Sequence, residues 1–266
     1  MENAGYKIQK IKFKALKVFS FASLVLAILS LAAVILFILI RGVEHLNYDI
    51  VFGEYTSRNP SILPALKGTM LLAIIAVGLA APIGIFAAIF LVEYTNSKSK
   101  LIKYIRIATE TLSGIPSIIY GLFGYIVFVV ALKLGYSLLG GGLTLSIMVL
   151  PLIVRSTEES LLSVPNALRE GSYALGASKV KTIFSVVLPS ATAGIVTSII
   201  LAIGRVISES AVLILTIGMV HKLPDSLLQP GTSLALDVYY FGSHGHPEAA
   251  AETAVVLIIL IAIINI

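Results

Sequence analysis

The sequence contains no cysteine, which excludes structural disulfides and thiol chemistry. Charged residues are scarce as well, at 12% of the chain against about 25% in water-soluble domains. In their place, 58% of the residues are hydrophobic, and the mean hydropathy is +1.00. A soluble core of 266 residues would not need so much apolar material, so we predict an all-α integral membrane protein built as one helical unit.

The residue groups that usually carry chemistry are missing too. Residues 171–178, GSYALGAS, begin like a phosphate-binding loop, but Ala177 stands where a lysine should follow the second glycine, so no nucleotide site is expected. The segment 243–249, SHGHPEA, offers no helical ligand pair and no evident fourth ligand, so no metal site is expected. The paired carboxylates Glu158–Glu159 are expected at the surface, and no Ser/His/Asp grouping suggests hydrolysis. The net charge of +5 does not indicate nucleic-acid binding, because the basic residues cluster between apolar runs.

Apolar runs long enough to cross a bilayer recur along the chain. Five can be delimited, the last interrupted only by Arg205 and Glu209: Val18–Ile40, Gly68–Val92, Thr111–Leu132, Gly135–Val154 and Ile183–Val220. At about 1.5 Å per residue, each of the first three covers the roughly 30 Å of a hydrocarbon core. The fourth opens with GYSLLGGG, so its helix is expected to start near Leu143 and to be short. A sixth run from Thr253 reaches only about 21 Å, so either the natural chain continues past Ile266 or this helix starts near Ala249.

The distribution of basic residues sets the expected orientation. Thirteen of the 19 lie in the N-terminal segment and in every second loop: Lys7, Lys10, Lys12, Lys14, Lys17, Lys98, Lys100, Lys103, Arg106, Arg155, Arg169, Lys179 and Lys181. This asymmetry places the N-terminus in the cytoplasm and, with six spans, the C-terminus as well. The first run is too long for a signal peptide, so an uncleaved span is expected. We divide the chain into 1–62, with the basic tail, first span and external loop, and a transmembrane core, 63–266.

The segment 170–189, EGSYALGASKVKTIFSVVLP, is not apolar enough to span and lies on the expected cytoplasmic side. One helical face is marked by apolar and small residues: Val164, Leu168, Gly171 and Leu175. Gly176 is placed to end this helix and Ser178 to cap a second one, which runs to a kink at Pro189. The second helix has its own apolar face: Val180, Ile183, Phe184, Val187 and Leu188. The pattern predicts two short amphipathic helices at a sharp angle, and on periodicity alone two helices lying on the lipid surface are an equal alternative.

The same segment resembles the EAA loop of ABC importer permeases, which reads Glu-Ala-Ala, three residues, Gly, nine residues, Ile, one residue and Leu-Pro. Glu170, Gly176 and the pair 188–189 match at the correct spacings, while small residues replace the two alanines and Val186 replaces the isoleucine. PALKGTMLLAIIAVGLAAPIGIFAAIFLVEY, ETLSGIPSIIYGLFGY and GRVISESA then occur in the order found in phosphate-type importers. From about Leu63 onward the chain is therefore similar to PstA-type permeases.

This resemblance implies a six-helix MetI-like fold of the type I importer class, in a prokaryotic cytoplasmic membrane, with a coupling loop at about 155–190. It implies a subunit that forms half of a pathway for inorganic phosphate and docks on a separate ATPase. The implied partners are a second permease of the PstC type, two ATPases of the PstB type and an extracytoplasmic phosphate-binding protein of the PstS type. ATP and Mg²⁺ would be bound by the ATPases, with no cofactor on this chain. The docking residues carried over are Glu170, Gly171, Ser172, Ala174, Leu175, Gly176, Ala177, Leu188 and Pro189.

Two further features are candidates for the substrate path. Arg205 and Glu209 interrupt an apolar run, where a lone charge costs roughly 2.5–3.5 kcal/mol, and their spacing of four predicts that both lie on one helix face. They are either a mutually neutralised pair that joins helices, or an arginine offered to a phosphate anion and held or gated by the glutamate. A predicted bend could line the same path with hydroxyl and amide groups, or serve helix packing alone: Ser113, Gly114, Pro116 and Ser117.

Two rival functions are open at this point. The cargo of an ABC permease could be another oxyanion, such as molybdate or sulfate. The chain could also be a secondary transporter driven by an ion gradient, but that class predicts intramembrane carboxylate relays and inverted repeats. Only Arg205 and Glu209 are available for a relay, and no repeat is visible in the sequence.

Overall fold

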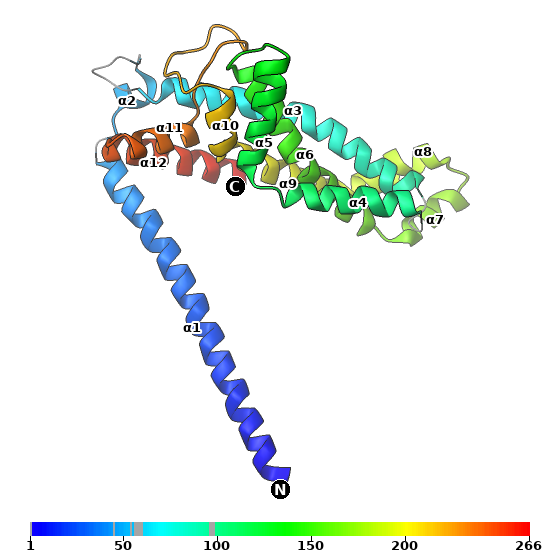
Figure 1. The fold of residues 1–266 in the computed structure, drawn as a ribbon. Helices are drawn as coiled ribbons and strands as arrows, with labels where there is room; N and C mark the ends of the chain where they lie inside the picture. Colours follow the sequence, from blue (N-terminus) through cyan, green and yellow to red (C-terminus); the bar gives the residue numbers. More distant parts are fainter. Residues whose placement is uncertain (1, 45, 54, 56–60, 96–98) are drawn as a thin grey trace.

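The computed structural model describes residues 2–44, 46–53, 55, 61–95 and 99–266, and within these residues the regular secondary structure is all helical, without strands (Figure 1). The α-helices are α1 (Glu2–Val43), α2 (Tyr48–Phe52), α3 (Leu63–Ile89), α4 (Lys100–Ser113), α5 (Ser117–Gly124), α6 (Leu138–Leu162), α7 (Asn166–Ala174), α8 (Lys179–Thr182), α9 (Leu188–Ile207), α10 (Ala211–Thr216), α11 (Leu234–Ser243) and α12 (Pro247–Asn265). Three π-helical turns extend or join them: η1 (Phe90–Tyr94) after α3, η2 (Tyr125–Ala131) after α5, and η3 (Ile183–Val187) between α8 and α9. Lys98, counted above for the orientation, lies outside the described residues.

Five helices in the described ranges are long and apolar enough to cross a membrane, and a bent pair brings the number to six. The bent pair joins Ile102–Ser113 to Ser117–Ala131 at 97°. The apolar run Thr111–Leu132 is therefore not one straight helix, and the predicted bend is present. The bend itself lies at the predicted SGIPS stretch, because Pro116 disfavours helical geometry at the residue before it and has no N–H to donate.

Helices α3, α6 and α9 lie side by side and form the core of the bundle (Figure 1). Buried aliphatic side chains such as Leu72 and Leu145 fill their interface. Glycines allow close approach: a Cβ added at Gly84 would lie 2.8 Å from Ile153, and one at Gly142 would lie 2.6 Å from Ile75. Such small-residue contacts replace the hydrophobic driving force that is missing between helices in lipid.

Helix α6 begins at Leu138, so the predicted start near Leu143 is wrong. The Ser137 hydroxyl accepts a hydrogen bond from the Gly140 N–H at 3.2 Å and caps the helix before the glycine run. The glycines are then held by packing, which outweighs their low helix propensity. Helix α12 begins at Pro247 and contains the buried Glu252, so the last span starts before Thr253, close to the predicted Ala249.

The predicted span Ile183–Val220 is divided in the structure. A continuous helical segment runs from Lys179 to Ile207, and the short helix α10 follows after a break at residues 208–210. Arg205 therefore lies in the last turn of α9, whereas Glu209 lies in the break, and the prediction that both share one helix face is wrong. The break is stabilised by the Glu209 carboxylate, which accepts a hydrogen bond from the Val212 N–H at 3.3 Å in the first turn of α10.

Helix α1 is 42 residues long and continuous with the basic N-terminal tail. It runs away from the bundle in Figure 1 and packs against α12 near its C-terminal end. None of its spanning window is buried within the chain. Since an exposed apolar helix needs lipid or another protein around it, this helix leaves a large surface for the membrane and for partners.

Candidate functional site

The coupling segment begins with α7, whose C-terminal turn has the predicted chemistry. Gly176 has a φ of +81°, the left-handed region that glycine adopts without strain. The turn is closed by the Gly176 N–H, which donates to the Tyr173 carbonyl at 2.9 Å, and by the Ala177 N–H, which donates to the Ser172 carbonyl at 3.1 Å. Ser178 then caps α8 by accepting from the Lys181 N–H at 3.4 Å. Both predicted capping positions are confirmed.

The second predicted amphipathic helix is not a separate element. Helix α8 has four residues and continues through η3 into α9. Val180 and Phe184, expected on its buried face, are exposed, while Ile183 and Val187 are buried against α3 and α6. Pro189 lies in the first turn of α9, directly after the π-helical turn, where the missing proline N–H interrupts the regular hydrogen-bond ladder.

The outward face of α7 is apolar and uncovered. Leu175 is 91% exposed at the tip of the turn, and Leu168 and Tyr173 are exposed beside the acidic Glu170. Figure 1 shows α7 and α8 at one end of the bundle, far from α2 and α11. Apolar side chains gathered on a projecting helix are typical of a protein docking surface.

The inward face of α7 carries a residue that the sequence reasoning did not single out. The Arg169 guanidinium is 2.9 Å from a Glu93 carboxylate oxygen in η1. A signal for this pair exists in the sequence, since Glu93 closes a long apolar run, and a carboxylate at a helix C-terminus is unfavourable unless it is paired.

Glu158, expected at the surface, is instead buried on α6 and pairs with Arg106 of α4 at 2.6 Å, so that expectation is wrong.

The predicted bend and Arg205 meet at a small cavity of about 200 Å³ in the middle of the bundle. Its walls are made by Leu112, Ser113, Ile115, Tyr120, Met148, Val149, Leu152 and Arg205. The Tyr120 hydroxyl donates to the Leu112 carbonyl at 2.9 Å and holds the bend closed. Ser113 and Arg205 are thus brought together, whereas Gly114, Pro116, Ser117 and Glu209 do not line this cavity.

Arg205 and Glu209 form an ion pair whose two side chains differ in exposure to solvent. Their closest atoms, Nη2 and Oε2, are 3.3 Å apart, and the Arg205 side chain is 53% exposed while that of Glu209 is 4% exposed. The carboxylate is fixed from two sides, by Arg205 and by the Val212 N–H. The arginine is therefore oriented by a buried carboxylate and still presents part of its guanidinium outward.

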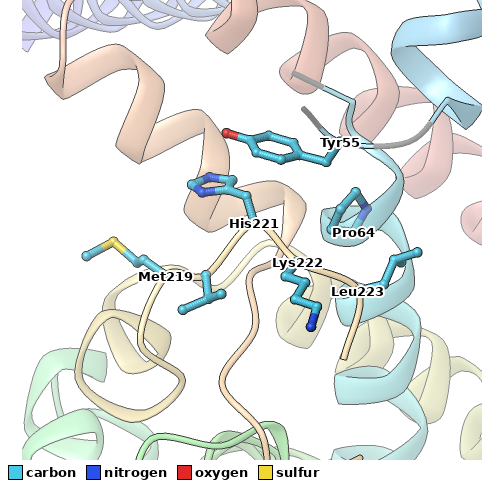
Figure 2. Close-up of a pocket in the computed structure, with 7 residues that line it drawn as sticks. Tyr55, Pro64, Met219, His221, Lys222 and Leu223 are labelled. Atoms are coloured by element: carbon cyan, nitrogen blue, oxygen red, sulfur yellow. The ribbon is translucent and has the colours of Figure 1, made fainter. Parts of the chain in front are cut away.

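A second and larger cavity, of about 670 Å³, opens near the start of α3, at the end of the bundle opposite to α7 (Figure 2). Figure 2 shows the His221 ring beside Tyr55, whereas the Lys222 side chain points away from both rings. The His221 Nε2 lies 3.1 Å from the Asp237 carboxylate, which also accepts from the Thr232 hydroxyl. Burial, followed by the charge of Asp237, raises the pKa of Tyr55 above the usual tyrosine value.

The sequence was compared with protein families and with named relatives. The model of the family described as "Binding-protein-dependent transport system inner membrane component" matches residues 80–266. A probable ABC transporter permease protein, YqgI of Bacillus subtilis, is 32% identical over 86% of this chain and 84% of its own. The phosphate transport system permease protein PstA 1 of Mycobacterium tuberculosis is 32% identical over 97% of this chain and 88% of its own. PstA of Pasteurella multocida is 29% identical over 100% and 96%.

Among solved structures, an inward-facing MetNI methionine ABC transporter superposes with a TM-score of 0.64, at 20% identity, over 77% of this chain and 91% of that chain. This likeness shows that the fold is the MetI-like fold of type I importers, as predicted. Such permeases are transport components that work with an ATPase and a substrate-binding protein. The match over residues 80–266, together with the relatives that cover nearly the whole chain, shows that this multi-pass membrane protein belongs to the family of inner-membrane components of binding-protein-dependent transport systems.

Proposed function

We propose that this chain is the transmembrane permease subunit of an ATP-driven importer for inorganic phosphate and forms half of the translocation pathway. The phosphate assignment is supported by relatives named as phosphate transport permeases, one of which aligns with 97% of the chain. The exposed Arg205 is consistent with an anion as cargo, because a guanidinium donates to two oxygens of a tetrahedral oxyanion at once.

The observation that carries the proposal is the uncovered apolar face of α7 at the projecting end of the bundle. This face would dock into a groove on a PstB-type ATPase, and that end of the molecule, with the N-terminus, would lie in the cytoplasm. Two such ATPases would bind ATP and Mg²⁺ and supply the energy. A PstS-type binding protein would deliver phosphate at the opposite end, where the cavity around His221 opens.

A second permease of the PstC type would complete the pathway. Arg205 lies at the edge of its cavity with half of its side chain exposed, so a neighbouring subunit is needed to enclose an anion there. Contact with the arginine would be weak and transient, because conduction requires release as well as entry. ATP binding would bring the ATPases together and displace the α7 helices, and the pathway would open outward; hydrolysis would reset it.

Substrate identity is tested by competition. The four-component complex is reconstituted in lipid vesicles, and ATP-dependent uptake of radiolabelled phosphate is measured against excess unlabelled phosphate, molybdate or sulfate. We expect that unlabelled phosphate alone suppresses the signal. Stronger suppression by molybdate or sulfate would reassign the cargo and leave the coupling proposal intact.

A further inference from the structure

Arg169, on the inward face of α7, is largely buried, and all three of its guanidinium nitrogens donate hydrogen bonds. Its Nε and Nη2 donate to the same Glu93 carboxylate oxygen at 3.1 and 2.9 Å. Nη2 also donates to the Leu161 carbonyl at 2.9 Å, and Nη1 donates to the Val164 carbonyl at 2.7 Å. A further contact joins Nη1 to the Asn166 side chain at 3.3 Å. The Arg169 and Glu93 side chains are 13% and 6% exposed, so both charges are held away from water.

These contacts join elements that are distant in the sequence. Glu93 lies in η1, which extends α3, and Leu161 lies in the last turn of α6. Helices α3 and α6 pack together through the centre of the bundle. One side chain of α7 therefore fastens the coupling helix to the ends of two membrane-spanning helices. Charge-assisted bonds from a planar guanidinium resist both displacement and rotation, because several fixed donors must move together.

Helix α7 also contacts α8, which continues through η3 into α9. The Ser172 and Thr182 hydroxyls are 2.9 Å apart and link α7 to α8 across the turn. The Lys179 ammonium lies 5.0 Å from the centre of the Tyr94 ring and links α8 back to η1. A displacement of α7 would thus be passed to α3 through Arg169 and to α9 through Ser172. The opposite face of α7, with Leu175, is exposed.

We propose that Arg169 and Glu93 are positioning residues that transmit the displacement of α7 to α3, so that ATP binding by the ATPases is converted into opening of the pathway. This inference rests on the proposed function of α7 as an ATPase coupling helix. It differs from docking itself, because the buried Arg169 faces the bundle whereas the exposed Glu170 beside it faces outward. It also differs from the Arg106–Glu158 pair, which joins α4 to α6 and leaves α7 out.

The first experiment separates transmission from folding. Arg169→Lys keeps the positive charge but replaces three donor nitrogens in a planar fork by one ammonium, which cannot reproduce the fork geometry around Glu93 and the two carbonyls. In the reconstituted complex we expect normal assembly, ATP hydrolysis within about twofold of the wild type, and about tenfold less phosphate taken up per ATP hydrolysed. Glu93→Gln should act in the same direction. Arg155→Lys is the matched control, because Arg155 is 54% exposed and its closest carboxylate, at 2.9 Å, is the exposed Glu159, with Glu158 farther away at 3.8 Å. Its uptake per ATP should be unchanged.

A spectroscopic readout removes the dependence on cargo. Because the chain has no cysteine, spin labels can be placed at Phe90→Cys in η1 and Tyr239→Cys in α11, both at exposed side chains. Addition of a non-hydrolysable ATP analogue to the complex should change the distance between the labels, and Arg169→Lys should abolish that change. If the distance still changes in the variant, or if uptake per ATP is unaffected, the pair is only structural and the inference is overturned. If the wild-type complex shows the distance change but takes up no phosphate, the proposed cargo is wrong and the role of the pair stands.

Discussion

At the residue scale, Gly176 combines a positive φ with open space. Its φ is +81°, and nothing lies within 4 Å of an added Cβ. A substitution there meets no steric obstacle, so its whole effect comes from the backbone conformation. An L-residue in the left-handed region costs about 1–2 kcal/mol, which falls on the turn that orients α7.

We therefore predict that Gly176→Ala lowers transport several-fold while membrane insertion and the overall helix content are unchanged. The measurement is ATP-driven uptake beside circular dichroism of the purified chain. Gly78→Ala is the control, because Gly78 lies inside α3 with equally open space and an ordinary helical backbone, where alanine is favoured. Equal uptake by both variants would show that the turn geometry does not matter for coupling.

Arg205 gives the second prediction at this scale. Arg205→Gln removes the charge that faces outward beside the cavity, so phosphate uptake should fall at least tenfold while the ATPases stay bound and active. Arg205→Lys should retain part of the uptake, because the charge persists without the planar fork. Unchanged uptake by the glutamine variant would mean that the Arg205–Glu209 pair only joins the end of α9 to α10.

At the element scale, local capping chemistry was readable in the sequence and helix limits were not. Gly176 and Ser178 act within a few residues of themselves, so their positions predict the turn between α7 and α8 correctly. The start of α6 depends instead on the Ser137 cap and on packing of the glycines against distant side chains such as Ile75. Propensity alone cannot include those contacts, which is why the start was placed too late.

The end of α9 illustrates a second limit of sequence reasoning. The residues from 183 to 220 are apolar enough to suggest one long helix, yet the helix stops at Ile207. At the stop, the Glu209 carboxylate makes two contacts: it caps α10 and pairs with Arg205. Hydropathy indicates that a segment prefers lipid, but it does not indicate where the helical hydrogen bonds of its backbone are interrupted.

Helix α7 supports a prediction about docking. Leu175 is 91% exposed, so Leu175→Asp should leave the fold of this chain intact and weaken binding of the ATPase, with at least tenfold less ATPase recovered on co-purification. Leu228→Asp is the matched control, since Leu228 is also an exposed leucine but lies in the loop before α11. If both variants recover the same amount of ATPase, the apolar face of α7 is not where it docks.

At the scale of the whole molecule, we propose different functions for the two ends of the bundle. In the proposed function, the end with α7 would receive the displacement from the ATPase, and the end with the His221 cavity would face the binding protein. Between them, the bend before α5 and the end of α9 bring Ser113 and Arg205 to one cavity. The exposed α1 and the half-exposed Arg205 leave surfaces for lipid and for a second permease, as expected of half a pathway.

The most direct test of the central claim compares energy sources in sealed vesicles. The chain is reconstituted with its partner permease and binding protein, with or without the ATPase, and uptake of labelled phosphate is followed with ATP or with an imposed proton or sodium gradient. We predict uptake only when both the ATPase and ATP are present. Uptake driven by the gradient alone, without an ATPase, would contradict the account of α7 as a coupling helix.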